Sequence, residues 1–554
     1  MLGYRTDFGA SLVLGQAPAH ELSSIAPWIL GAYLILLLVL GYLGQRRGVS
    51  NEEDYYLAGR QQGWIVSSLT IMATFFSSFA LLGAPGLVYK EGVAFALFAL
   101  NVPLAGAAVY VLGKRLAKAG REHGYVTPGD MIVAHYDSRI ALRLLTALVG
   151  LLYAVPYVVM QINAGGILTE VLFPNAANAF EWGAVGLAII TMVYVMVGGM
   201  RSVAWTDVVQ GTLLIGGMLI AGWATVETLG GVRSFFARLE ELPPAALTVP
   251  GTSGSWPPWK LFTVCVFGSL GSMIQPAQWM RYYAAGSAKT LRRSAIIFAT
   301  VLPVCFLFGV MLVGLGGQAL YPLVEGVDGG VLPHPSVGAT ARDFDRILIV
   351  ILEAHLPELL GSIGSAVSAL ILVAIMAASM STADSNLHAL SAVITRDVYD
   401  HLVRPHATDR ERTWFGRAVI AVVTLIALGI IFWGRTSEHF SPIALIAQMG
   451  LLAIAFSVQL LPITLDMLFL KRGTRAGAVA GLLVGLSLVF LGTPFASMIT
   501  GSDSGLVTTM GHLRRTVDLG ALGCIANMIV FASVSLFTAK PPSTTSPSDR
   551  SVVL

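Results

Sequence analysis

Long apolar runs alternate with short polar connections along most of this chain. A helix needs about 20 mainly apolar residues to cross a bilayer, and many of the runs reach that length. We predict about thirteen spanning helices, with approximate limits 25–45, 63–89, 92–113, 140–172, 182–199, 203–229, 259–282, 289–317, 358–388, 413–434, 440–469, 474–495 and 517–538. The pattern therefore indicates an all-α polytopic membrane protein that lies in a lipid bilayer.

The composition agrees with this interpretation. Of the 554 residues, 55% are hydrophobic and only 12% are charged, and the mean hydropathy is +0.75. A soluble protein would carry about twice that charged fraction. The net charge of +3 is small, and no basic run indicates binding to nucleic acid. The three cysteines lie in apolar runs, without the spacing of a disulfide framework or a zinc site.

Basic residues are distributed unevenly between alternate loops, which predicts the orientation. One set of loops holds most of them, namely Arg46, Arg47, Arg60, Lys114, Arg115, Lys118, Arg121, Arg201, Arg281, Lys289, Arg292, Arg293, Arg404, Arg410, Arg412, Lys471, Arg472 and Arg475. The other loops are poorer, with Arg514 and Arg515 as exceptions. We therefore expect the N-terminus outside and the C-terminus inside, which fits an odd number of spans.

The segments outside the spans are short or polar. Residues 1–24 are mixed and polar and show no cleavable signal, so we expect an extracellular N-terminal segment. The stretch 341–357 mixes charged residues with Ile and Leu, which predicts a helix outside the membrane. The tail 540–554 is rich in Pro and Ser, and we expect it to be disordered in the cytoplasm.

Two predicted spans contain helix-breaking residues. The span 63–89 has a Ser-Ser pair in its middle and a Gly-Ala-Pro-Gly stretch after it, and the span 259–282 has two glycines followed by Gln275-Pro276. Irregular backbone at membrane depth is tolerated only where protein buries it or where it lines a wet cavity. The alternative is tight packing of continuous helices, because small residues are common where membrane helices meet.

The two interrupted spans each begin a set of five helices, 63–229 and 259–434. Because five is odd, the two sets enter the membrane from opposite sides and form inverted repeats. The leading helix 25–45 precedes them, and additional helices at 440–538 follow. Interrupted helices at matching places in inverted halves are typical of a transporter with its binding site near the midplane.

The ninth span carries two adjacent hydroxyl groups, Ser381 and Thr382, deep in an apolar helix. Each hydroxyl could simply bond to a carbonyl one turn earlier, as membrane Ser and Thr usually do. Alternatively, the two hydroxyls and the carbonyls freed by a broken helix could hold sodium, since a hard cation prefers oxygen ligands. The residues alone leave both interpretations open.

Five stretches resemble the sodium/solute symporter family, which includes proline, pantothenate, monocarboxylate, sialic acid and sugar carriers. They are MATFFSSFALLGAPGLVY, MSTADSNLHALSAVITRDVYD, GGMRSVAWTDVVQG (198–211), QPAQWMRYYAA (275–285) and KRGTRAGAVAGLLVG (471–485). The similarity covers most of residues 30–500 in the right order. It implies the leucine-transporter type of fold with inverted five-helix repeats, and a place in the plasma (inner) membrane.

The resemblance also implies ion sites. The main sodium site falls on the carbonyls of Ala73, Phe76 and Ala378 and on the hydroxyls of Ser381 and Thr382. An additional ion or exit path falls on Asp207, Ser381, Asp384 and Ser385. Some relatives have serine where this chain has Asp384. With an aspartate at this position, Asp384 and Asp207 would be two carboxylates that face one small cavity.

The two acids also have simpler interpretations. Asp207 could be a helix N-terminal carboxylate that faces the cytoplasmic interface, although an acid inside a span is a functional candidate by default. Asp384 lies one helical turn after Ser381. It could be solvated in the cytoplasmic vestibule, or it could pair with His388 or Arg396.

For the substrate pocket, the resemblance implies residues on four spans: Ser77, Phe79, Gly83, Tyr153, Gly268, Ser272, Pro276 and Gln448. The two aromatic residues could equally be core residues. Proline carriers have aromatic side chains where Gly268 and Ser272 stand, and sugar carriers have a polar residue at Ala80; both departures argue against those substrates. The positive ends of half-helices suit an anionic group, so we expect a small carboxylate.

Together these observations predict a sodium-coupled secondary active symporter. We expect it to import a small polar organic solute, an amino acid, monocarboxylate or pantothenate-like molecule, by alternating access. The alternatives are a sugar or sialic acid symporter and a non-transporting membrane sensor with the same fold. An enzyme has little support, because HExxH, GxSxG and GxxxxGK motifs are absent. The expected partners are sodium, the solute and the bilayer, with no nucleic acid and no obligate protein partner.

Overall fold

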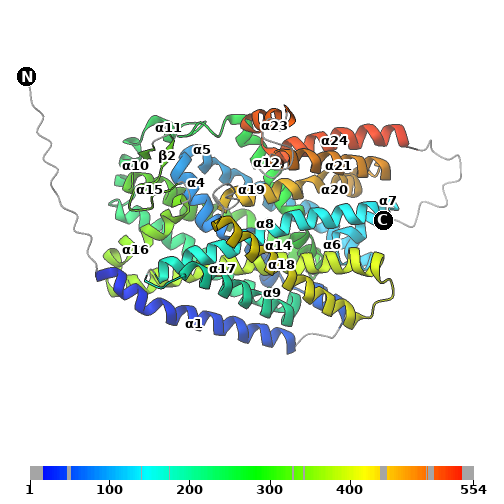
Figure 1. Ribbon diagram of the computed structural model, residues 1–554, viewed down its shortest axis with the longest axis horizontal. Coiled ribbons are helices and arrows are strands. Elements are labelled where there is room, and N and C mark those ends of the chain that lie inside the picture. The colour runs from blue at the N-terminus through cyan, green and yellow to red at the C-terminus, as the bar shows by residue number, and fades with distance from the viewer. Residues whose placement is uncertain are drawn as a thin grey trace, which may run out of the picture.

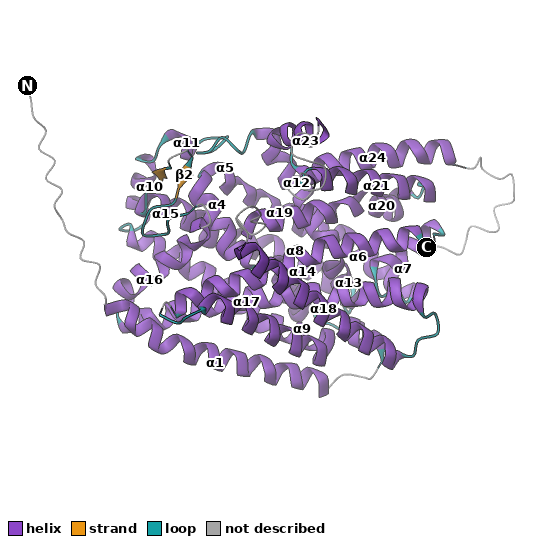
Figure 2. Ribbon diagram, viewed as in Figure 1, coloured by secondary structure: helices purple, strands orange, loops and turns teal. Residues whose placement is uncertain are grey.

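A computed structural model of the protein describes residues 17–46, 51–138, 140–173, 175–326, 330–340, 343–436, 446–493, 496 and 505–539. Helices make up most of these residues, and the connections between them are short (Figure 2). Nine of the described helices are long and apolar enough to cross a membrane, or ten when the bent pair Trp64–Phe75 and Phe79–Glu91 counts as one span. The predicted all-α polytopic class is confirmed.

The helices below are labelled α, and short 3-10 or π-helical segments are labelled η. The first part of the chain forms α1 (Ala17–Arg46), α2 (Glu52–Leu57), η1 (Ala58–Arg60), α3 (Trp64–Phe75), η2 (Phe79–Gly83), α4 (Ala84–Glu91), α5 (Val93–Ala96), η3 (Leu97–Leu100), α6 (Asn101–His123), α7 (Pro128–Tyr136), α8 (Ala141–Leu172), α9 (Ala179–Thr228), α10 (Val232–Glu240) and α11 (Pro244–Leu247).

The second part forms α12 (Pro258–Ile274), α13 (Pro276–Ala284), α14 (Ala288–Phe306), η4 (Leu307–Leu312), α15 (Val313–Leu320), β1 (Val324–Glu325), β2 (Val331–Leu332), η5 (Asp343–Arg346), α16 (Ile347–Leu360), α17 (Ser362–Val393), η6 (Ile394–Val403) and α18 (Asp409–Thr436). The last part forms α19 (Ile446–Ser457), η7 (Val458–Leu460), α20 (Leu461–Leu465), η8 (Asp466–Leu470), α21 (Arg475–Leu491), α23 (Gly505–Thr516) and α24 (Leu519–Thr538).

The first predicted interruption is confirmed. Helix α3 ends at Phe75, Phe76 is extended with φ −79° and ψ 122°, and the chain resumes in η2 and α4. The two parts are bent by 59°. The break lies at Phe76 and Ser77, while Ser78, Gly83 and Pro85 lie in helical backbone after it. The alternative of a continuous, tightly packed helix is wrong for this span.

The second predicted interruption is also confirmed. Gln275 is extended with φ −64° and ψ 153°, and it separates α12 from α13. Pro276 is the first residue of α13, where a missing N–H costs no helical hydrogen bond. Helix α13 packs against α3, α6 and α17, so the chain stays inside the bundle after the break.

Helix α9 covers two predicted spans, 182–199 and 203–229. A straight helix of its 50 residues would be about 75 Å long, far more than the roughly 30 Å hydrocarbon core. It is not straight, because Gly199 has φ 56° and ψ −159°. A Cβ atom there would lie 2.7 Å from the backbone oxygen of Tyr55, so both the backbone angle and the close approach require glycine.

The interrupted helices lie within the bundle. Helix α3 packs against α9, α13, α14 and α17, and α1 packs on the outside against α9 and α17 (Figure 1). Helix α1 begins at one end of the bundle and α24 ends at the other (Figure 1). The helix predicted at 341–357 is present as η5 and α16. Residues 17–24, predicted as part of a polar segment, are the first turns of α1, whereas residues 1–16 and the tail 540–554 lie outside the described residues.

Candidate functional site

Five oxygen atoms meet where α3 ends and α17 crosses it. The Thr382 hydroxyl donates to the carbonyls of Phe76 at 3.0 Å and Ala73 at 3.3 Å. The Ser381 hydroxyl donates to the carbonyls of Ala73 at 3.3 Å and Ala378 at 3.0 Å. All five residues are buried. The structure thus brings together every residue of the predicted main sodium site.

The break in α3 explains why these carbonyls are available. The last carbonyls of any helix have no N–H partner within the helix, and the extended Phe76 ends α3 inside the protein. Thr382 bonds across to α3 and not to the preceding turn of its own helix, whereas Ser381 does both. Simple back-bonding is therefore wrong for Thr382. A cage of neutral oxygens suits a hard monovalent cation.

A buried ion pair lies next to this cage. Asp207 accepts hydrogen bonds from Arg281 Nη2 at 3.2 Å and from the Thr70 hydroxyl. Arg281 Nε also donates to the carbonyl of Thr70 at 3.2 Å, and Arg281 Nη2 donates to the Ser385 hydroxyl. The exposed fractions are 0% for Asp207 and 1% for Arg281. The interpretation of Asp207 as an interfacial helix-end carboxylate is therefore wrong.

Arg281 also corrects the sequence analysis, which counted it among the loop residues. It lies in α13, and α13 stays packed inside the bundle because the break at Gln275 redirects the chain. A buried guanidinium needs a carboxylate and full hydrogen bonding to offset its lost hydration. Asp207 supplies the carboxylate, and Thr70, Ala277 and Ser385 supply further acceptors.

Asp384 is buried and belongs to the same polar cluster. Its carboxylate accepts hydrogen bonds from the Tyr194 hydroxyl at 2.7 Å and from the Ser385 hydroxyl at 3.0 Å. It is neither solvated nor paired with Arg396, whose carboxylate partners are Glu52 and Asp130. It does not pair with His388 either, whose ring lies 3.4 Å from the carbonyl of Tyr56. These three simpler interpretations are wrong.

The formal charges of this cluster do not cancel. Two buried carboxylates, Asp207 and Asp384, face one buried guanidinium, Arg281, and Ser385 contacts both Arg281 and Asp384. One negative charge remains if both acids are ionised. Two close carboxylates disfavour each other's charged form, so such a cluster takes up either a proton or a further cation.

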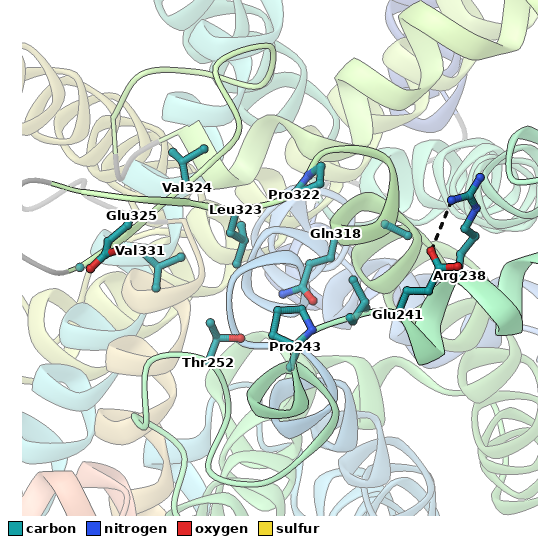
Figure 3. Close-up of a pocket in the computed structure, with 14 residues that line it drawn as sticks. Arg238, Glu241, Pro243, Thr252, Gln318, Pro322, Leu323, Val324, Glu325 and Val331 are labelled. Carbon is teal, nitrogen blue, oxygen red and sulfur yellow. Dashed lines mark hydrogen bonds and ion pairs between the residues drawn. The ribbon is translucent and has the colours of Figure 1, made fainter. Parts of the chain in front are cut away.

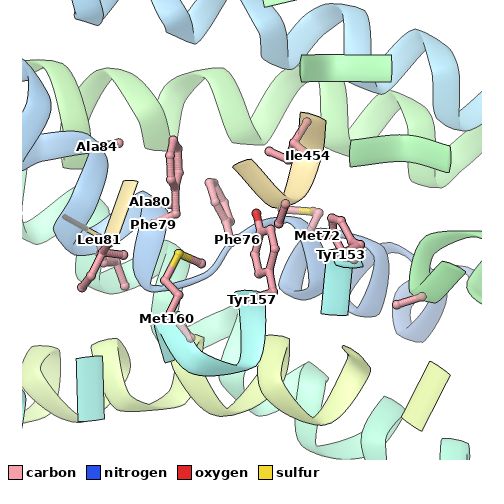
Figure 4. Close-up of a cluster of buried hydrophobic side chains, with 14 of the residues drawn as sticks. Met72, Phe76, Phe79, Ala80, Leu81, Ala84, Tyr153, Tyr157, Met160 and Ile454 are labelled. Carbon is pink, nitrogen blue, oxygen red and sulfur yellow. The ribbon is translucent and has the colours of Figure 1, made fainter. Parts of the chain in front are cut away.

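A small cavity lies beside the break in α3. Its volume is about 20 Å³, room for about one water molecule. It is lined by Thr74, Phe75, Phe79, Phe98, Asn101, Tyr153, Tyr157, Ser272, Phe306 and Ile454. Figure 4 shows the aromatic side chains of Phe79, Tyr153 and Tyr157 gathered there with Ile454. Three of the predicted substrate residues, Phe79, Tyr153 and Ser272, therefore line one cavity.

The other predicted substrate residues lie around this cavity or away from it. Ser77 lies in the break, and its hydroxyl accepts from the backbone N–H of Phe79 at 3.1 Å. Gly83 is the last residue of η2, Gly268 lies in the middle of α12, and Pro276 begins α13. Gln448 is exposed and lines a different, larger cavity. Their roles in binding stay predictions.

Several residues of the site were missed from the sequence. Asn101 lines the small cavity, and its Oδ1 atom is buried without a hydrogen-bond partner among the described residues. Gln161 accepts from the backbone N–H of Ser78 at 3.1 Å and from its hydroxyl at 2.8 Å. A lone amide side chain in an apolar span was a usable signal for both. Phe98 and Tyr157 gave no such signal.

A larger cavity elsewhere contains none of the predicted site residues. Its volume is about 590 Å³, and it lies between α10, α11, α15 and the β1–β2 pair (Figure 3). Arg238 and Glu241 on its wall are joined by a hydrogen bond of 3.3 Å (Figure 3). It lies among connecting segments at the α4 end of the first broken span, where Gln318 on its wall donates to the carbonyl of Tyr89 at 2.6 Å.

The sequence model of the Sodium:solute symporter family matches residues 55–485. The chain belongs to this family. Sodium is therefore the coupling ion of this symporter, and solute symport is its class of activity. The resemblance found in the sequence is confirmed.

Known relatives agree with the family. The sodium/proline symporter of Escherichia coli (strain K12) is 28% identical over 472 residues, which cover 84% of this symporter and 86% of that protein. The sodium/pantothenate symporter of the same organism is 27% identical, covering 84% of this symporter and 89% of that protein. Both of these relatives are sodium-coupled symporters.

Two solved structures show the fold. A Na+-coupled sialic acid symporter superposes with a TM-score of 0.72 at 20% identity, covering 93% of this symporter and 98% of that chain. Mhp1, a nucleobase-cation-symport-1 family transporter, superposes with a TM-score of 0.52 at 13% identity, covering 86% and 95%. Both are neighbours of the leucine-transporter type, which agrees with the predicted fold class.

Proposed function

We propose that this symporter imports a small, carboxylate-bearing organic solute together with sodium, by alternating access. The observation that carries the proposal is the meeting of the Ser381 and Thr382 hydroxyls with the carbonyls of Ala73, Phe76 and Ala378. These atoms join a broken helix to a continuous one. A change in their distance on opening or closing would make sodium binding favour one state, which is the requirement for a ligand to shift a conformational equilibrium.

We further propose thirteen spans in the plasma membrane, with the N-terminus outside and the C-terminus inside. The bend of α9 at Gly199 divides that helix into two spans, and the two shorter apolar helices Pro258–Ile274 and Arg475–Leu491 add two more. The beginning of α1 and the end of α24 lie at opposite ends of the bundle, which supports termini on opposite sides of the membrane (Figure 1). In this arrangement α16 lies outside the membrane.

The small cavity is the proposed substrate pocket in a closed state. At about 20 Å³ it has no room for an organic solute, so helices must separate before a solute enters. The unpartnered Oδ1 of Asn101 favours a solute that carries an N–H or O–H donor. Phe79, Tyr153 and Tyr157 would cover its apolar part. A sugar or sialic acid is the alternative substrate.

The test is uptake by the purified protein in lipid vesicles. An inward sodium gradient should drive accumulation of one member of a panel of amino acids, monocarboxylates and pantothenate, and the same vesicles with sodium on both sides should only equilibrate. The same panel can be screened first by thermal stability, because a ligand that binds only the folded state raises it. Binding that needs sodium, without accumulation of any solute of the panel, would contradict the proposed import of a carboxylate-bearing solute.

We also propose that the cluster of Asp207, Ser381, Asp384 and Ser385 takes up a second cation. The charge left over after Arg281 pairs with Asp207 supports this. Uptake should then follow sodium with a Hill coefficient clearly above one, falling toward one in Asp384→Ala. The sodium titration of uptake measures it, with Ser535→Ala, a buried hydroxyl at the far end of α24, as the control. A one-site sodium curve in the wild type, with one charge moved per neutral solute, would contradict this proposal.

A further inference from the structure

A second large cavity contains the basic residues that broke the loop-charge pattern. Its volume is about 640 Å³. It lies between α4, α19, the end of α23 and the segment that leads into α12. Arg514 and Arg515 line it, and so do Lys90 and Lys260. Glu91 and Asp518 are the acids on its wall. The four basic and two acidic residues leave an excess of positive charge.

The acids are already engaged. Glu91 accepts hydrogen bonds from the Ser253 hydroxyl at 2.6 and 2.7 Å, and Lys90 Nζ lies 3.5 Å from its carboxylate. Asp518 caps α24 by accepting from the backbone N–H of Ala521 at 3.1 Å. Neither carboxylate forms an ion pair with Lys260 or with either arginine in the part of the chain that the structure describes.

Lys260 and Arg514, by contrast, donate hydrogen bonds to neutral groups. Lys260 Nζ donates to the carbonyl of Ser255 at 2.8 Å, and Arg514 Nη1 donates to the carbonyl of Gly492 at 3.1 Å. Each keeps further N–H donors for a ligand. Arg514 and Arg515 are exposed, and Gln448 adds an exposed amide to the same wall. The wall therefore offers positive charge and hydrogen-bond donors together, which suits a carboxylate.

A row of aromatic rings leads from this cavity to the proposed substrate pocket. Lys260 Nζ lies 4.7 Å from the ring centre of Trp256, and Trp256 packs on Phe95 at 4.8 Å. Phe95 stacks on Phe98 at 5.2 Å, and Phe98 packs on Phe79 at 5.8 Å. Phe98 and Phe79 line the small cavity. The two cavities are thus the two ends of one aromatic row.

We propose that this cavity is a recruiting site, where the carboxylate of the solute binds Lys260 and Arg514 before the solute passes the aromatic row. A cleft lined by one sign of charge raises the local concentration of oppositely charged ligands. Their association rate then rises by about 10- to 1,000-fold. Naming the ligand as the transported solute rests on the proposed function. The preference of the cavity for small carboxylates does not.

The test measures the charge preference directly, in the full chain, without transport. In a background with Cys265, Cys305 and Cys524 replaced by serine, Gln448→Cys is labelled by an anionic and by a cationic methanethiosulfonate. The labelling rate with the anionic reagent is divided by the labelling rate with the cationic reagent. This ratio is compared with the same ratio at Ser336→Cys, an exposed loop position outside the cavity. We expect a ratio about tenfold higher at position 448.

Variants assign the preference to the basic residues. In the double variant Lys260→Gln, Arg514→Gln the ratio should fall to near the value at position 336. Lys260→Arg keeps the charge and should keep the ratio, which separates a charge effect from misfolding. A ratio at position 448 equal to that at 336, or one that survives in the double variant, would overturn the proposal.

Occupancy is tested with a small carboxylate and its neutral amide. At constant ionic strength, lactate should slow the labelling of Gln448→Cys and lactamide should not, and the double variant should lose this protection. Slower labelling in vesicles that contain phosphatidylglycerol, with no effect of lactate, would assign the site to a lipid phosphate and overturn the proposal. Protection by lactate without sodium-driven uptake of any solute would refute the proposed function and leave the anion site standing.

Discussion

Replacing Thr382 by alanine will raise the sodium concentration needed for half-maximal uptake by about tenfold. The substitution removes one of five oxygens from a cage that carries no formal charge, so no carboxylate compensates for the loss. A lost hydrogen-bonding or ligand group in a buried site costs about 1–3 kcal/mol, and 1.4 kcal/mol is a factor of ten in affinity. Ser381→Ala should act in the same direction.

The measurement is a sodium titration of uptake in vesicles. Ser379→Ala is the matched control, because Ser379 is a buried hydroxyl on the same helix that bonds back to the carbonyl of Ile375 at 3.1 Å. It should leave the sodium dependence close to that of the wild type. If Thr382→Ala and Ser381→Ala both keep the wild-type curve, sodium binds elsewhere.

Arg281→Gln will lower the free energy of unfolding by about 3–5 kcal/mol, because it leaves Asp207 as a buried charge without its partner. The double variant Arg281→Gln, Asp207→Asn should recover much of this loss, since both charges are then gone. Denaturant unfolding in mixed micelles measures the difference. Arg292→Gln, at an exposed position of α14, is the control and should change the free energy by no more than about 0.5 kcal/mol.

The comparison of the single variant with the double variant decides whether Arg281 stabilises the protein through its charge. A loss in Arg281→Gln that the second substitution does not recover would show that Arg281 stabilises the protein through its bonds to Thr70 and not through its charge. No loss at all would mean that water or an ion reaches the cluster and replaces the guanidinium. Either result would remove the basis for counting one leftover negative charge.

The spans and the two breaks could be predicted from the sequence because both depend on local chemistry. A bilayer requires long apolar runs, and Ser77-Ser78 and Gln275-Pro276 interrupt two of them. The oxygen cage could be predicted only through the family resemblance. The hydroxyl pair alone fits ordinary back-bonding, and the structure shows bonds of both kinds at Ser381.

Arg281 and two of the pocket aromatics, Phe98 and Tyr157, could not be predicted, for different reasons. The loop-charge rule counts a basic residue near a span end as exposed, and it cannot see that a break at Gln275 turns α13 back into the bundle. The sequence does not identify Phe98 and Tyr157 as pocket residues, because an aromatic side chain in a membrane helix can face lipid or protein equally well. Asn101 could in principle have been identified from the sequence, since a polar amide side chain inside a span is a candidate for a functional role.

The neutral oxygen cage has an electrical consequence. Three of its oxygens are backbone carbonyls and two are hydroxyls, so a sodium ion held there keeps its full charge inside the membrane. A membrane potential acts on one elementary charge with about 2.3 kcal/mol per 100 mV, scaled by the part of the field that the ion crosses. If the cage binds sodium from the outside as proposed, an inside-negative voltage helps to load it, while the empty cage carries no charge of its own when it returns. The voltage would then assist the loading step of the cycle and leave the return of the empty cage to thermal motion.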